Sequence, residues 1–141
     1  MNLTQLSKNI DTAFERVGYV NSVLTGDPYE RWNNKEVKYV SACYALESSD
    51  SDENITTYSL IIYAADRLLE DASNTVQSFD ICQTAIEVML NFLTDSGKED
   101  KLWIEDIRTY TPFVQKFADN LAGVYVRTKI KVRNTLNLCK E

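Results

Sequence analysis

The stretch Gly-Val-Tyr-Val-Arg-Thr-Lys-Ile-Lys-Val-Arg, residues 123–133, has the clearest pattern in this 141-residue sequence. Apolar or small side chains alternate with large polar ones, which is the period of a β-strand that buries one face and exposes the other. The exposed face carries four cations spaced about 6.5–7 Å apart along the strand. They are Arg127, Lys129, Lys131 and Arg133. The pattern predicts a half-buried antiparallel strand.

Two other segments have the spacing of amphipathic helices. Residues 3–17 place their apolar side chains on one stripe, with Asn2 and Gln5 as a candidate capping box and Gly18 as the candidate end. Residues 76–93 carry a wider apolar stripe. We therefore expect an N-terminal helix and a second helix that covers the sheet.

A long β-hairpin is predicted between these helices. Residues 36–46 and 55–65 are rich in Val, Ile, Leu and Tyr, which favours strands. The connector, residues 47–54, is polar and too long for a tight turn, so we expect a mobile acidic tip. Its acidic residues are Glu47, Asp50, Asp52 and Glu53.

The remaining segments are predicted to connect or extend these elements. Residues 21–35 are interpreted as an extended connection, in which Tyr29 and Trp32 pin the loop to the core rather than form a platform for a ligand. Residues 101–110 have a strand-like rhythm that Pro112 breaks or bends, and residues 134–141 are interpreted as a loose tail. The expected fold is a single α+β domain, residues 1–141, with a small antiparallel sheet, a long hairpin, an N-terminal helix and one covering helix.

Composition excludes several classes of protein. The chain has no histidine, so imidazole zinc sites, Ser-His or Cys-His pairs and histidine bases cannot form. Its three cysteines lack paired spacing, which favours a reducing compartment, with Cys43 and Cys82 in apolar patterns typical of a core. We expect neither a signal peptide nor a membrane span, and therefore a protein made in cytoplasm.

Catalytic motifs are also missing. The four glycines are scattered singly, so no phosphate-binding loop, nucleophile elbow or dinucleotide fingerprint is present. Carboxylates near Asp66 or Asp106 offer only a remote magnesium nuclease, because no lysine stands at motif spacing. We expect no enzyme, no metal and no cofactor.

Charge is divided unevenly along the chain. The net charge of -6 combines residues 1–112, with nine Lys/Arg and nineteen Asp/Glu, and residues 113–141, with six and two. The cationic row allows three interpretations: a solvated face, a surface for a protein partner, or sequence-independent contact with phosphates. The acidic tip is interpreted as a solubilising turn or as a segment that reaches the basic row of a neighbouring subunit. A calcium loop is disfavoured because the glycine and distal glutamate are absent.

Three segments carry a resemblance to a known family. They are residues 26–30 followed by 37–39, the hairpin strand 58–68, and Phe-Ala-Asp-Asn-Leu-Ala-Gly-Val-Tyr at 117–125. With the order of elements, they resemble the tail-terminator and tail-completion (neck ring) proteins of tailed bacteriophages, in particular those of crAss-like and other Bacteroides phages.

The resemblance implies a structural virion protein without catalytic activity, made in the cytoplasm of the host bacterium. Its copies would form a ring, six in the usual case and twelve in the alternative, that joins the head connector to the tail around the DNA channel. The implied partners are other neck and tail rings, with transient non-specific contact with DNA and no membrane. Asp119, Leu121 and Gly123 would shape the start of the last strand, and the cationic row would lie on a ring surface.

A second hypothesis belongs to a different class. A cytoplasmic adaptor or inhibitor with an acidic surface would bind one host protein tightly and be absent from virus particles.

Overall fold

The computed structural model describes residues 2–33, 37–69, 71–96, 102–105, 107–116 and 120–133. The elements are α1 (Leu3–Val17), β1 (Ser22–Thr25), α2 (Pro28–Arg31), β2 (Ser41–Ser51), β3 (Ile55–Arg67), α3 (Thr75–Ser96), β4 (Leu102–Ile104), β5 (Thr111–Lys116) and β6 (Asn120–Arg133). The six-stranded sheet has the order β1-β2-β3-β6-β4, and β5 also pairs with β6. All pairs are antiparallel except β1 with β2. This confirms the predicted α+β class.

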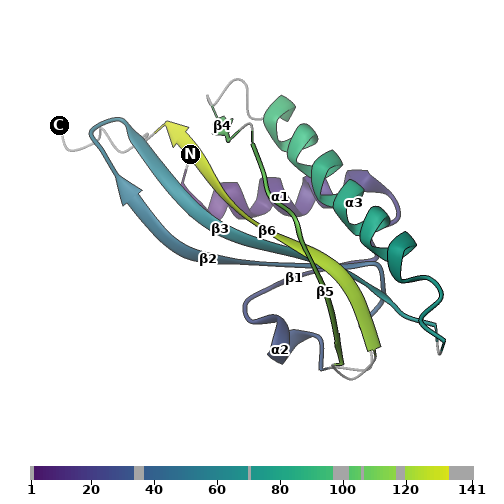
Figure 1. The fold of residues 1–141 in the computed structure, drawn as a ribbon. Coiled ribbons are helices and arrows are strands. Elements are labelled where there is room, and N and C mark those ends of the chain that lie inside the picture. The colour runs from purple at the N-terminus through teal and green to yellow at the C-terminus, as the bar shows by residue number, and fades with distance from the viewer. Residues whose placement is uncertain are drawn as a thin grey trace.

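The centre of the sheet is the pair β3 and β6, which runs from Ile55 opposite Arg133 to Arg67 opposite Leu121. Paired residues share a face, so the even-numbered residues of both strands point to the same side. Helices α1 and α3 cover that side, where Phe14, Ile62 and Ile130 belong to one buried core (Figure 1). The predicted alternation of β6 is confirmed, because its even-numbered residues from 122 to 132 are all buried.

The ends of α1 follow the sequence signals. The Asn2 side chain accepts a hydrogen bond from the Gln5 backbone N–H, and the Gln5 side chain accepts one from the Asn2 backbone N–H, which completes the predicted capping box. Gly18 ends the helix with φ of 90°, a conformation that favours glycine. Within the described parts of the chain, no helix combines the length and apolar character that a membrane span requires.

The β2–β3 hairpin is confirmed, but its connector is shorter than predicted. Pairing continues to Ser51 opposite Thr56, and the Asp52 N–H donates to the Ile55 carbonyl at 2.8 Å, so that the turn is tight. Both strands are exposed to solvent near the tip, so polar side chains stay hydrated when they become part of a strand. The ladder therefore extends past the predicted boundary, with a bulge between Leu46 and Ser48.

Two predictions about the flanking segments are wrong in detail. Residues 21–35, expected to be an extended connection, contain the short parallel strand β1 and the single-turn helix α2. The strand expected over 101–110 is confined to β4, and Pro112 lies inside β5 instead of interrupting a strand. Because β5 pairs with β6 alone among the described strands, its other edge needs no ladder hydrogen bonds and tolerates proline.

Candidate functional site

The face of the sheet opposite α1 and α3 has two different halves. Its base, at the end near α2, carries a second small core made by the buried residues Trp32, Cys43, Ala65 and Leu121. Trp32 is fully buried, and its Nε1 donates to Ser41 Oγ at 2.9 Å. This confirms that Trp32 pins the connecting segment to the sheet. We call this region the covered half.

A cluster of aromatic rings ends the covered half. Trp32 stacks on Phe113 of β5 at 6.2 Å between ring centroids, and Tyr63 lies edge-on to Phe113 at the same distance. Tyr63 also contacts Tyr125, its register partner on β6, at 5.6 Å. Beyond these two tyrosines, Ile61 is still buried, and the odd-numbered residues of β3 nearer the hairpin turn are partly or fully exposed.

The residues predicted at the start of the last strand have structural roles. Leu121 is fully buried in the second core, and Asp119 lies outside the described residues. Gly123 pairs with Ala65, where a Cβ on residue 123 would lie 2.8 Å from Ala65 Cα and closer still to the carbonyl oxygen of Ala64. Only glycine fits this approach of β6 to β3.

Beyond the tyrosines, the predicted cationic row lies on the uncovered part of the face. Residues 127, 129, 131 and 133 are all exposed and lie opposite Ile61, Ser59, Thr57 and Ile55 of β3. Within the described parts of the chain, Lys129 and Lys131 have no ion-pair partner. We call this region, from residue 127 to the hairpin turn, the open half.

Acidic side chains occupy the other flank of the open half. Asp50 of β2 pairs in register with Thr57, which pairs with Lys131, so that these three residues form one row across the sheet. Adjacent strands are about 4.8 Å apart, which places the β2 and β6 backbones about 10 Å apart. Acid on β2 and base on β6 are thus separated by the polar side chains of β3.

One pair already bridges this separation inside the chain. Arg127 Nε lies 3.3 Å from the carboxylate of Glu47, the residue at the β2 bulge. The hydrogen bond and the charge of Glu47 raise the pKa of Arg127. Arg127 and Glu47 therefore satisfy each other, and the lysines provide the uncompensated positive charge.

The remaining acidic residues stand at the turn itself. Asp52 Oδ1 accepts the Glu53 backbone N–H at 2.7 Å, which stabilises the turn. Asp50 and Glu53 make no ion pair within the described ranges. Across the described ranges, no group of three or more Cys, Asp or Glu side chains could hold a metal ion.

Sequence reasoning missed one residue of the open half. Trp103 of β4 lies opposite Lys131 and is 45% exposed, whereas its neighbours Leu102 and Ile104 face the helix-covered core. The signal was the alternation of this short strand, which places Trp103 on the same face as the lysine.

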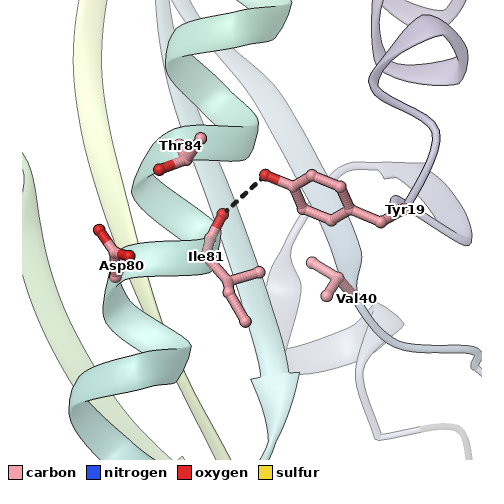
Figure 2. Close-up of a pocket in the computed structure, with 5 residues that line it drawn as sticks. All are labelled: Tyr19, Val40, Asp80, Ile81 and Thr84. Carbon is pink, nitrogen blue, oxygen red and sulfur yellow. Dashed lines mark hydrogen bonds between the residues drawn. The ribbon is translucent and has the colours of Figure 1, made fainter.

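Away from this surface, a cavity of about 400 Å³ lies between α3 and the segment after α1. Tyr19 donates a hydrogen bond to the Ile81 carbonyl at 3.2 Å, and Val40 lies beside them (Figure 2). Asp80 points away from the tyrosine. The walls are mainly apolar, without a nucleophile and base in contact.

A half-buried ionic cluster holds the segment between β4 and β5 against α3. Arg108 donates from Nε and Nη2 to the two carboxylate oxygens of Glu87 at 3.2 and 3.3 Å, and Tyr110 Oη also donates to Glu87. Burial raises the pKa of Glu87, but the two hydrogen-bond donors and the Arg108 charge outweigh it and hold the pKa below its usual value. The cluster is a structural clamp.

The fold and the open half define a class of protein: an α+β domain that buries one sheet face under helices and presents half of the other as a charged surface. No protein-family model matches the chain, and no curated protein matches it. A functional proposal therefore depends on the residues of the open half and on the resemblance of the three sequence segments.

Proposed function

We propose that this chain is a structural subunit of the neck or tail of a tailed phage, where copies form a ring that joins the head connector to the tail around the DNA channel. The observation that carries the proposal is the open half. It is a sheet surface on which the odd-numbered side chains of β6 from residue 127 are exposed, and two of its lysines lack ion-pair partners in the described structure. Surfaces of this kind serve binding rather than catalysis.

The three segments that resemble neck ring proteins support the same proposal. Residues 26–30 include most of α2, residues 58–68 include most of β3, and residues 120–125 begin β6. Ala65 of β3 pairs with Gly123 of β6, and Leu121 and Ala65 share the second core. The resembling segments thus meet at the packed base of the sheet, and residues 58–61 of β3 extend into the open half.

The test is the presence of the chain in purified phage particles. Quantitative mass spectrometry of particles from infected cells should find it at a fixed ratio to the portal protein. Absence from purified particles, together with a tight complex with one host protein, would favour the adaptor or inhibitor instead.

A charge-reversal variant tests the surface. Lys129→Glu with Lys131→Glu should reduce incorporation into particles while leaving stability nearly unchanged, because exposed substitutions change stability by about 0.5 kcal/mol or less each. Lys8→Glu with Lys38→Glu is a matched control, since both lysines are exposed and lie outside the open half. Normal incorporation of the first variant would mean that the cationic row is only a solvated face.

A further inference from the structure

The open half separates its charges by strand. Carboxylates stand on β2 and in the turn, and cations stand on β6, with β3 between them. Glu47 and Arg127 neutralise each other. What remains without ion-pair partners in the described structure is a positive site, Lys129 and Lys131, and a negative site, Asp50 and Glu53.

This arrangement fits a polyanion poorly. A phosphate backbone laid along β6 would lie about 10 Å from the carboxylates of β2, slightly beyond the Debye length of about 8 Å at physiological ionic strength, so that salt weakens their repulsion without removing it. Repulsion from β2 and the turn would therefore oppose the attraction of the two lysines. A short acidic segment of protein carries fewer negative charges than a phosphate backbone, so it meets less of this repulsion while it contacts the two lysines.

The chain itself carries such a segment. The hairpin turn is tight, projects at the end of the sheet away from α2, and is acidic (Figure 1). If two copies stacked their open halves face to face with their strands parallel, their covered halves would also face each other. The segments that carry α2 and Trp32 would then collide, because they lie over the sheet there. A narrow turn reaches the lysines of another copy without that collision.

We infer that the acidic hairpin turn of one copy binds the Lys129–Lys131 site of the next copy, with Asp50 and Glu53 as the contacting carboxylates. The two sites are different parts of the surface, so the contact is heterologous, and its repetition closes into a ring when the rotation allows. This inference rests on the proposed ring function and names the contact that would build the ring.

The test uses two charge-reversed variants of the whole chain. One variant carries Lys129→Glu and Lys131→Glu, and the other carries Asp50→Lys and Glu53→Lys. Asp52 is kept because it stabilises the turn. Sedimentation velocity over a concentration series at low ionic strength should show self-association of the natural chain. Self-association of each variant alone should be weaker than that of the natural chain by a factor of roughly ten or more.

An equimolar mixture of the two variants is the decisive sample. If the contact joins different copies, the mixture recovers the assembly, because each reversed site then meets a complementary site on the other variant. If these charges pair only within one chain, the mixture stays dissociated, and only a chain that carries all four reversals together recovers self-association. That result would overturn the inference. The control with Lys8→Glu and Lys38→Glu should assemble like the natural chain.

Two further outcomes would also overturn the inference. One is a natural chain that stays monomeric at every concentration and salt, and the other is unchanged assembly of both variants. If Lys129→Glu with Lys131→Glu instead abolishes binding of a short DNA oligonucleotide but leaves self-association intact, phosphate is the ligand of the row. Each of these results leaves the particle test of the proposed function standing, so the two failures are distinguishable.

Discussion

Replacement of Gly123 by alanine should destabilise the fold through the closest approach of its two central strands. The new Cβ would lie 2.8 Å from Ala65 Cα, whereas carbon atoms in contact are about 3.5–4.0 Å apart. The Cβ would lie closer still to the Ala64 carbonyl oxygen, so the strands must separate by more than about 1 Å, and the cost lies at the upper end of the range of about 1–3 kcal/mol that overpacking shows. Because unfolded alanine has less conformational entropy than unfolded glycine, the substitution also raises the free energy of unfolding by about 0.4–1 kcal/mol. We expect a net loss of about 2 kcal/mol.

Urea unfolding followed by circular dichroism measures this loss, with a fall in Tm of about 6 °C as a second readout. Lys129→Ala, at an exposed position of the same strand, should change stability by less than about 0.5 kcal/mol. Ala65→Gly added to Gly123→Ala should not rescue it, because the nearest atoms are backbone atoms. A Gly123→Ala chain as stable as the natural one would show that β6 and β3 tolerate a Cβ at residue 123.

Three further predictions concern buried or half-buried polar groups. Thr128 Oγ1 is buried and has no hydrogen-bond partner among the described residues, so Thr128→Val should raise the free energy of unfolding by about 1 kcal/mol in urea. Glu87→Gln should cost about 1 kcal/mol at pH 7, a modest figure because the side chain is 36% exposed. The pKa of Glu87 is lower in the folded state than its usual 4.5, so the stabilisation is present above that pH and is lost on acidification. Stability curves of the natural and Gln chains should therefore converge below pH 4.5. Burial raises the pKa of Cys43 and of Cys82 to about 12, so a Cys139→Ser chain should react with a thiol reagent at pH 8 only after denaturant is added; rapid labelling of the folded chain would contradict this.

Local periodicity was enough to predict much of the fold. The alternation of residues 123–133 placed the cations on an exposed face, and the stripe of residues 3–17 placed one side of α1 in the core. Both follow from the geometry of a single element, because a strand repeats every two residues and a helix every 3.6. The burial of Cys43 and Cys82 followed from the apolar patterns around them, and the pinning of the loop followed from the occurrence of Trp32 in a polar segment.

The predicted strand boundaries were wrong where pairing with a neighbouring strand overrides the local structural preference of the residues. The polar residues of the connector entered a strand because β3 offered them a continuing ladder. Pro112 entered β5 because an edge strand needs hydrogen bonds on only one side. Neither partner strand is visible in a local window of sequence.

Local patterns in the sequence were enough to establish which side chains share a face within one element: the cations of β6 and the apolar stripes of both helices. Tertiary structure alone decided that the outer face is half covered, because α2 and Trp32 reach it through contacts that span the sheet. It also decided that Arg127 is compensated by Glu47 while Lys129 and Lys131 are not. The physical reason is distance: an ion pair forms within about 4 Å, and only the pairing register of β2, β3 and β6 determines which acid lies that close to which base.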